Sequence, residues 1–431
     1  MTSHYIEQHF RLLHISLFSL GLALSIHYAE NQILTVDPAQ MLTKGYLAVY
    51  HNIWLPYGNI ASATANVPGY LSTVVIGVPL LVWDNPWAPM LLLLALRIAS
   101  FILFDAVIKQ IFSANVRLLF IVLYWLNPWL LYESVLYNPS YLCFFAALHL
   151  WSAFKQKEKS SFIHSFLHVA AIGGAMQLHY SWPILALISG YLLVRKMVKP
   201  CWSAVSLASL VILLSLVPYY YEYAANAQIR GNSDRYLGYG LVNIYPVLQA
   251  VLYWLRYGAV SFAMPIITDT RFDWVTQADW FRKIIQYCWQ GLLYAIGAIS
   301  VVANAGINWQ AWRIIKYKLM PSNRIETAQE WLLLFAFAAF GATIICAMLS
   351  PIAFKHWHLL LVFPTALFPA LALAEQWRKK VPKGFNYFIL SLAMCFTVTN
   401  LITAHYNYRF SYKVSFANQV NKFIVTENLA K

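Results

Sequence analysis

The side chains best suited to acid–base chemistry in this 431-residue chain lie in polar segments between long apolar runs. The first such segment, residues 29–89, carries Asp37 directly before Pro38. A carboxylate followed by proline is typical of the start of a helix, and a carboxylate near a membrane surface could also accept a proton from a substrate hydroxyl. Both roles stay open, because a cap also fixes the position of the carboxylate. The same segment holds three further candidates for substrate binding: Lys44, Tyr57 and Tyr70.

A second polar turn, residues 127–140, reads Asn-Pro-Trp-Leu-Leu-Tyr-Glu-Ser-Val-Leu-Tyr-Asn-Pro-Ser. Prolines near both ends favour a rigid reversal of the chain over a continued helix. Such a turn could place Glu133 or Asn138 opposite Asp37. The alternative is a plain hairpin connection in which Glu133 is solvated.

Two later turns carry imidazoles. His179 lies in residues 177–180, Gln-Leu-His-Tyr, and could bind a phosphate or titrate near neutral pH, although a histidine at a membrane interface is more often simply hydrogen-bonded. Lys355, His356 and His358 precede a segment that contains two prolines. A lysine beside two imidazoles favours an anionic partner.

Composition places the chain among polytopic helical membrane proteins, because 60% of its residues are hydrophobic, only 11% are charged, and the mean hydropathy is +0.57. We expect residues 1–431 to form a single membrane-embedded domain. The formal net charge of +14 gathers in the loops between apolar runs, where membrane topology and anionic lipid explain it, so we expect no nucleic-acid partner. The five cysteines stand singly, without metal-type spacing.

The basic residues also predict the topology. Five clusters are each separated from the next by two apolar stretches, and the positive-inside rule assigns all of them to the cytoplasm: Lys109/Arg117, Lys155/Lys157/Lys159, Arg195/Lys196/Lys199, Arg313/Lys316/Lys318/Arg324 and Arg378/Lys379/Lys380/Lys383. This topology requires that two of the apolar stretches do not cross the membrane. Residues 69–83 are too short for a span of about 20 residues, and residues 245–265 contain Arg256 and read as a helix on the membrane surface.

About eleven spans result, near residues 10–28, 89–108, 117–133, 140–154, 162–178, 182–194, 202–219, 286–304, 327–349, 359–376 and 385–403. The N-terminus is then cytoplasmic, and residues 29–89, 220–285 and 404–431 are the large outward segments. Arg97 falls inside a span, where a charge is costly, so we expect it to face the bundle interior, as a functional group or as a tether to backbone carbonyls.

The order of these elements resembles the GT-C membrane glycosyltransferases, in the bacterial branch of the protein O-mannosyltransferases and the lipid A aminoarabinose transferase, akin to glycosyltransferase family 39. In that family an acidic residue heads a helix of the first outward loop, as Asp37 does, and a surface helix opened by Pro-Gly and tyrosine follows, as in residues 68–70. An arginine at the start of the next span resembles Arg97. The resemblance extends to Asn138-Pro139-Ser140, Gln177-Leu-His179-Tyr180 and His356-Trp357-His358.

The resemblance implies an all-α, GT-C-like bundle in the bacterial inner membrane with a periplasmic active site. It implies a polyprenyl-phosphate sugar donor, an envelope glycan, lipid or protein as acceptor, and membrane lipids as surroundings. Asp37 would be the catalytic base. The donor phosphate would be held by Lys355, His356 and His358, with Arg256 or Arg235.

The chain departs from the family pattern at two carboxylates, where it has Pro38 and Asn138. Hard divalent cations require several oxygen ligands, so we expect a metal-independent, inverting enzyme without a cofactor. Two other classes stay open: a polysaccharide polymerase or O-antigen ligase that uses a polyprenyl-linked donor, and a lipid or sugar transporter. Transporters usually contain inverted repeats, and the sequence has no matching pair.

Overall fold

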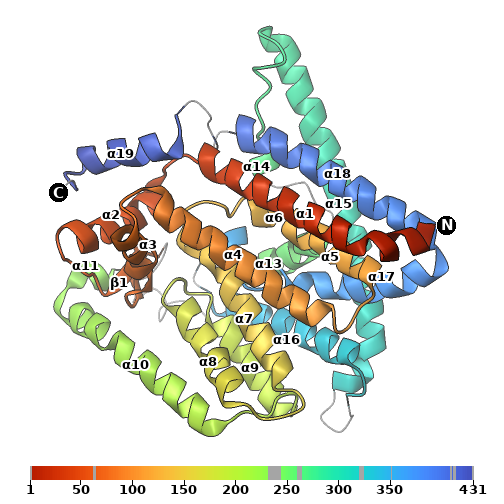
Figure 1. Cartoon of the computed structure of the whole chain (residues 1–431), viewed down its shortest axis with the longest axis horizontal. Coiled ribbons are helices and arrows are strands. Elements are labelled where there is room, and N and C mark those ends of the chain that lie inside the picture. The colour runs from red at the N-terminus through yellow and green to blue at the C-terminus, as the bar shows by residue number, and fades with distance from the viewer. Residues whose placement is uncertain are drawn as a thin grey trace.

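The structure is a computed structural model that describes residues 2–61, 65–231, 244–259, 265–319, 325–350, 352–407, 410 and 414–429. It is a helical bundle, and the two-stranded sheet β1–β2 is the only sheet in the described part of the chain. Figure 1 shows long helices crossing the molecule and a group of short elements, α2, α3, β1 and α11, gathered on the left, where α4 begins and α10 ends. The predicted all-α membrane fold is therefore confirmed.

Among the described residues, six helices are long and apolar enough to cross a membrane. They are α1 (Thr2–Asn31), α4 (Trp87–Ile108), α10 (Trp202–Ala225), α15 (Asp279–Ile315), α16 (Ala328–Met348) and α18 (Pro382–Tyr406). Each coincides with one of the eleven predicted spans. The 37 residues of α15 make it about 56 Å long, which exceeds a hydrocarbon core of about 30 Å. The predicted limits 286–304 were thus too narrow, because the helix continues into the polar flanks on both sides.

The other five predicted spans are shorter or broken, so the count of eleven is not confirmed. They correspond to α5 (Ala114–Trp125) with α6 (Pro128–Leu131), η1 (Asn138–Tyr141) with α7 (Leu142–Lys155), α8 (Phe162–Met176), α9 (Pro183–Val194), and η3 (His356–Leu359) with η4 (Thr365–Leu367) and α17 (Phe368–Lys380). Proline explains the breaks, because it lacks an N–H group and clashes with the preceding turn. Pro128, Pro139 and Pro369 each lie in the first turn of the element that follows a break.

The predicted first loop folds into α2 (Val36–Tyr50), β1 (Tyr57–Ile60), β2 (Asn66–Pro68) and α3 (Leu71–Val82). α3 has 12 residues, about 18 Å, which is too short to cross a membrane. α2 packs closely on α3 at Gly45, where an added Cβ would lie 2.3 Å from the Ile76 side chain. Gly69 has a φ of +92°, and a Cβ there would collide with the side chain of Gln177. This glycine therefore lets the β-hairpin rest against the turn that carries His179.

The predicted second outward segment contains α11 (Ala227–Arg230), α13 (Ile244–Tyr257) and α14 (Pro265–Thr268). α13 has 14 residues, fewer than a span needs, and exposes Leu248 and Leu252. These features agree with the surface helix predicted for residues 245–265, although its depth in a membrane stays a prediction. The C-terminal helix α19 (Phe416–Thr426) contacts α1, and Gln419 Oε1 accepts a hydrogen bond from Leu34 N at 3.0 Å.

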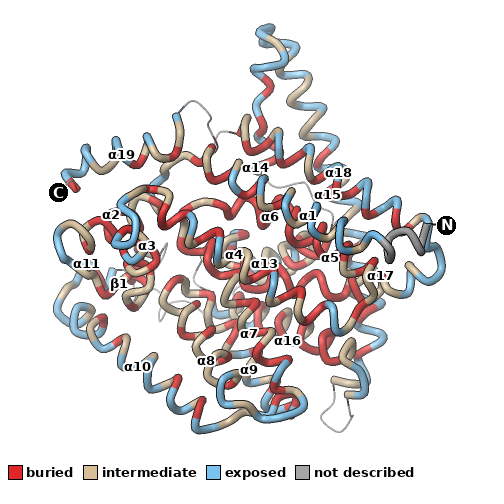
Figure 2. The backbone as a smooth tube through the Cα atoms, viewed as in Figure 1, coloured by how far each residue is buried: buried red, intermediate tan, exposed pale blue. Residues whose placement is uncertain are grey.

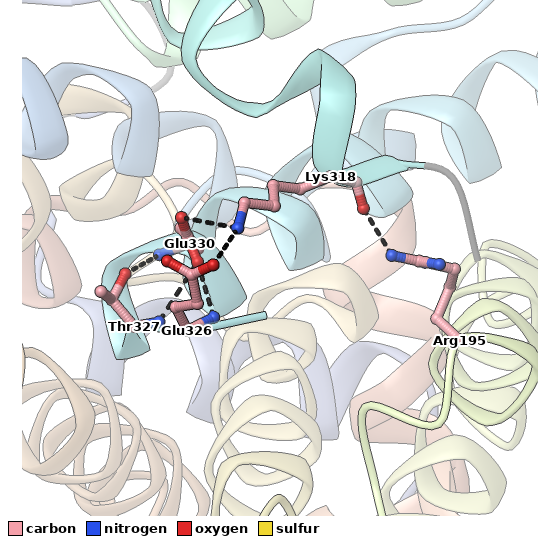
Figure 3. Close-up of polar contacts among 5 residues, drawn as sticks. All are labelled: Arg195, Lys318, Glu326, Thr327 and Glu330. Carbon is pink, nitrogen blue, oxygen red and sulfur yellow. Dashed lines mark hydrogen bonds and ion pairs between the residues drawn. The ribbon is translucent and has the colours of Figure 1, made fainter. Parts of the chain in front are cut away.

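Hydrogen bonds and ion pairs join the neighbourhoods of the five basic clusters at one end of the bundle, which we call the basic end. Lys199 N donates to Gln156 O at 2.9 Å, and Arg195 donates to Lys318 O. Figure 3 shows this second link and the Lys318 ammonium between Glu326 and Glu330, at 2.8 and 3.7 Å. The remaining links run from Gln329 to Ala372 O and from Ser113 to Glu375. The loops that carry the basic clusters therefore lie at the same end of the bundle.

Buried residues concentrate on the central helices, including α4, α5, α7 and α16, whereas α10 and α15 are largely exposed along their length (Figure 2). The centre is aromatic: Trp125 stacks on Phe18 at 5.5 Å between centroids and donates from Nε1 to the Phe18 carbonyl at 2.9 Å. Asn400 ties α18 to this centre, because it accepts from Tyr28 and donates to Leu126 O. This rigid centre supports the short elements at the opposite end from the basic clusters.

Candidate functional site

Glu133 is the centre of a buried polar cluster. Its side chain is essentially inaccessible, Oε1 lies 3.4 Å from His356 Nε2, and Oε2 accepts a hydrogen bond from Ser140 Oγ at 3.1 Å. Proline breaks position all three residues, because α6 and η1 reverse the chain around Glu133 and η3 contacts η1. The alternative of a solvated Glu133 was therefore wrong: the turn folds inward and buries the carboxylate.

Aromatic rings surround His356. The rings of Trp129 and Tyr132 lie 5.6 and 5.3 Å from the imidazole, and Tyr257 Oη donates to the His356 carbonyl at 2.6 Å. Arg256, on α13, lies with its guanidinium 5.0 Å from the centroid of the Trp129 ring, a cation–π contact. The site thus combines a carboxylate, an imidazole and a guanidinium within an aromatic enclosure.

Arg97 extends this cluster from α4. It is only 2% exposed, and none of its three guanidinium nitrogens has a hydrogen-bond partner among the described residues. The prediction that it faces the interior is confirmed, whereas the described chain offers no carbonyl tether. Glu133 is the carboxylate that interacts electrostatically with it. α4 also contacts η1, the element that follows Glu133.

Unpaired polar atoms are concentrated here. Besides the Arg97 nitrogens, six atoms in this part of the described chain are buried without a hydrogen bond: Trp129 Nε1, Glu133 Oε1, Ser134 Oγ, Tyr141 Oη, Arg256 Nη2 and His356 Nε2. Buried polar groups are normally hydrogen-bonded, and each exception calls for an explanation. A polar or anionic ligand would supply the missing partners. The arrangement therefore has the chemistry of a binding site.

A second group of predicted residues lies on the other side of η1 and η3. Asn138 Nδ2 donates to Leu178 O at 2.8 Å, and the His179 and His358 rings are 5.6 Å apart. Burial lowers the pKa of His179 to about 4 and holds the pKa of His358 well below its usual value, so both imidazoles are neutral near pH 7. Donors from Lys355 N and Trp357 Nε1 point at the two ring nitrogens of His358. Neither imidazole therefore carries a positive charge with which to bind an anion. The Lys355 side chain is exposed.

Asp37 lies in the first turn of α2, with Thr35 at the N-cap and no side-chain capping bond. Capping therefore does not explain this carboxylate, which has no hydrogen bond or ion pair to the described residues. Burial raises the pKa of Asp37 above its ordinary value. The start of this loop is joined to the Glu133 turn, because Gln32 Oε1 accepts a hydrogen bond from Leu136 N at 3.1 Å, and α2 contacts η1. Asp37 thus lies on an element that packs against the cluster.

Lys44 lies seven residues after Asp37, on the same face of α2. It is 7% exposed, its Nζ is 6.0 Å from the Tyr57 ring, and burial lowers its pKa to about 8. Tyr70 is the N-cap residue of α3, beside the Gly69 turn. Arg235 lies outside the described residues.

Nothing in the sequence singled out Trp129, which contacts Arg256, or Tyr257, which contacts His356. Ser140, which contacts Glu133, stood out only as part of the Asn138-Pro139-Ser140 run. The available signal was the aromatic residue directly after Pro128 in the turn of residues 127–140. The role of Tyr257 could not be recognised from the sequence, because its hydrogen bond to the His356 carbonyl joins segments 99 residues apart.

Solved structures that match the chain include two of ArnT from Cupriavidus metallidurans. The apo structure matches with a TM-score of 0.51 at 12% sequence identity, over 88% of this chain and 62% of that chain. The structure with bound undecaprenyl phosphate matches with a TM-score of 0.50 at 12% identity, over 100% and 74%. The chain has a GT-C-like fold. In the first comparison it spans less than two thirds of the length of ArnT.

No protein-family model matches the chain, and no curated protein matches it. The likeness to ArnT therefore establishes the fold at low identity. It confirms the GT-C-like architecture expected from the order of the outward elements. The chemistry has to be argued from the site.

Proposed function

We propose that this protein is a metal-independent, inverting glycosyltransferase that moves a monosaccharide from a polyprenyl-phosphate donor to an envelope glycan, lipid or protein. The observation that carries the proposal is the buried cluster of Arg97, Glu133, Arg256 and His356, whose unpaired nitrogens lie inside a GT-C-like bundle. A fold alone does not define a function, so the site supplies the argument.

The donor phosphate fits the cationic side of this cluster. Arg97 is buried and Arg256 is partly buried, and a guanidinium in such surroundings binds a phosphate more strongly than an exposed one does. ArnT has been solved with undecaprenyl phosphate bound, which supports a lipid phosphate as the ligand of this fold. We assign the phosphate to Arg97 and Arg256, with His356 oriented beside them by Glu133.

Asp37 is the proposed base. The acceptor hydroxyl oxygen forms a bond to the anomeric carbon of the sugar, its proton passes to the Asp37 carboxylate, and the bond from the anomeric carbon to the phosphate oxygen breaks. The polyprenyl phosphate leaves with the electron pair, and the arginines stabilise the negative charge that develops on it. A single displacement of this kind inverts the anomeric centre. The raised pKa of Asp37 improves its basicity.

The other predicted residues receive different roles. Lys44 on α2 and Tyr57 on β1 lie close together, and we assign them either to binding the acceptor or to contacting the donor phosphate. Tyr70, at the start of α3, receives the same assignment. His179 and His358, being neutral, are assigned to hydrogen-bonding a sugar hydroxyl and not to phosphate binding. Lys355 is assigned to the membrane-surface entrance, since its side chain is exposed.

Metal independence rests on the sequence, where Pro38 and Asn138 stand at two positions that carry carboxylates in the family pattern. Glu133 is also engaged by His356 and Ser140. The positive-inside rule, applied to the basic clusters of the predicted loops, supports a site on the periplasmic side of a bacterial inner membrane. The likeness to ArnT favours a transferase over a transporter or a polymerase.

The proposal is tested with the full-length chain in lipid nanodiscs in the presence of EDTA, by measuring the binding of undecaprenyl phosphate. We expect the wild type to bind and Arg256→Ala to lose at least about tenfold in affinity, because hydrogen bonds between charged groups contribute roughly 1.5–3 kcal/mol. Arg282→Ala is the matched control, because Arg282 is ion-paired to Asp273 and Asp279 at the start of α15. Absence of binding to the wild type, or a requirement for added Mg²⁺, would contradict the proposal.

The acceptor is sought separately. Mass spectrometry of lipid A, envelope glycans and secreted glycoproteins from a deletion strain should show one species that lacks a monosaccharide. An envelope identical to that of the parent strain in all three classes would count against a transferase.

A further inference from the structure

The C-terminal end of α10 carries a cluster of tyrosines that lies against the β1–β2 hairpin. Tyr219 Oη donates a hydrogen bond to the Asn66 carbonyl at 3.1 Å, so this side of α10 faces the hairpin. Residues three and four positions apart share one face of a helix, which places Glu222 and Tyr223 on the same side. The Tyr219 and Tyr223 rings are 5.8 Å apart. Figure 1 shows the end of α10 beside the group of short elements that contains α2, α3 and β1.

The hairpin joins this cluster to Asp37, the proposed base. Asn59 Nδ2 donates a hydrogen bond to the Asp37 carbonyl at 3.0 Å. Tyr57 precedes Asn59 by two residues in β1, a separation of roughly 7 Å along a strand. Tyr57 is half-buried, and Glu222 interacts electrostatically with it. A line of polar and aromatic side chains therefore runs from Asp37 over the hairpin to the end of α10.

The chemistry of this line suits a carbohydrate. A tyrosine ring offers an apolar face to the C–H groups of a sugar ring, and its hydroxyl both donates and accepts hydrogen bonds. The Glu222 side chain is exposed, and an ionised carboxylate accepts hydrogen bonds from sugar hydroxyls. The same negative charge would repel the phosphate groups of a lipid acceptor.

The hairpin offers little to a peptide acceptor, which in extended form would bind by adding a strand to one of its edges. Ile60 and Asn66 face each other in the hairpin, and their backbone groups are already engaged. Asn66 O accepts hydrogen bonds from the hydroxyls of Tyr180 and Tyr219. Ile60 N donates to Gln40 Oε1 at 3.2 Å. Both edges are thus closed by side chains of this protein.

We propose that the acceptor is a glycan and that Tyr57, Glu222 and Tyr223 bind the sugar unit next to the one whose hydroxyl reaches Asp37. The inference rests on the function proposed above and selects one acceptor class among glycan, lipid and protein. It also separates acceptor binding from donor binding, because the hairpin and α10 supply none of the residues of the buried charged cluster.

Two substitutions on α10 test this subsite. Tyr223→Leu keeps an apolar side chain and removes the ring and the hydroxyl, whereas Glu222→Gln keeps the shape and removes the charge. Tyr221→Leu is the matched control. Tyr221 is 75% exposed and lies two positions from Tyr219, on the other side of the helix.

The measurement uses the full-length protein in nanodiscs. The probe is the fluorescently labelled pool of oligosaccharides released by mild acid from the envelope of a deletion strain, which should accumulate the unmodified acceptor. The affinity for this pool should fall about tenfold in Tyr223→Leu and about threefold in Glu222→Gln. Tyr221→Leu should bind the pool as the wild type does. The affinity for undecaprenyl phosphate, measured alongside, should be unchanged in all three variants and shows that they are folded.

The failure of the inference and the failure of the proposed function are distinguishable. If the wild type binds undecaprenyl phosphate but not the oligosaccharides, the acceptor is not a glycan and the proposed function stands; lipid A vesicles and tryptic peptides of the secreted proteins are then compared as probes. Equal binding of the oligosaccharides by the wild type, Tyr223→Leu and Glu222→Gln would also overturn the subsite. If the wild type binds no undecaprenyl phosphate, the proposed function fails and the inference with it.

Discussion

Replacement of Asp37 by asparagine separates catalysis from structure. The carboxylate has no hydrogen bond to the described residues and no capping role, so its main structural contribution is the favourable position of a negative charge in the first turn of α2. That contribution is typically about 0.3–1 kcal/mol. Burial raises the pKa of Asp37, because folding disfavours the ionised carboxylate. The contribution of Asp37 to the stability of the fold therefore falls as the pH rises through the pKa of this group. The two effects oppose each other at neutral pH, and Asp37→Asn should leave the free energy of unfolding within about 1 kcal/mol of the wild type.

The expected effect on sugar transfer is much larger. General-base catalysis contributes roughly a hundred- to ten-thousandfold, or about 3–5 kcal/mol of the barrier, so Asp37→Asn should lose at least about a hundredfold in turnover. The assay follows sugar transfer from the lipid-linked donor, with thermal stability of the purified protein measured alongside. Asp84→Asn is the control in the same loop, since that carboxylate already accepts a hydrogen bond from Tyr50. Turnover of Asp37→Asn within a few-fold of the wild type would refute the assignment and make Glu133 or Glu30 the next base to test.

Two further predictions concern a buried lysine and the topology. The pKa of Lys44, lowered by burial to about 8, means that its charge is lost as the pH rises through that value, so the Michaelis constant for the donor should increase above about pH 8 in the wild type. Lys44→Arg should remove this increase, and a pH profile identical in both would exclude Lys44 from binding the donor. In a chain with its five cysteines replaced, an impermeant thiol reagent added from the periplasm should label His51→Cys and leave Lys109→Cys unlabelled; the reverse pattern would invert the topology.

The fold was predictable where one physical rule dominates. Long apolar runs give the six long helices, and the basic clusters, read by the positive-inside rule, place their loops at one end of the bundle, where Arg195 and Lys318 indeed interact (Figure 3). The short and broken elements were not predictable as such. Pro128, Pro139 and Pro364 are visible in the sequence, but whether proline kinks a helix or ends it depends on the neighbours that satisfy the freed backbone groups.

The site was predicted as a set of residues and not as an arrangement. The sequence named Arg97, Glu133, Arg256 and His356, yet it could not show that the chain breaks at Glu133 and His356 pack against α4 and α13, which carry the two arginines. It also offered His179 as a group that could titrate near neutral pH and His358 as a ligand of the phosphate, because the sequence does not report the burial that lowers the pKa of both. Spacing along a chain identifies candidates, while protonation depends on tertiary packing.

The unpaired arginine is the strongest reason to regard the cluster as functional. Removing a guanidinium from water costs several kcal/mol unless a partner of opposite charge compensates, and replacing buried charges by apolar side chains often increases stability. A bundle optimised only for stability would therefore have an apolar residue in place of Arg97, which leaves three nitrogens unsatisfied among the described residues. Glu133 compensates part of the charge but shares its carboxylate with His356 and Ser140. The remaining deficit is an excess of positive charge inside a low-dielectric enclosure, and an anionic group such as the phosphate of the proposed donor would remove this deficit.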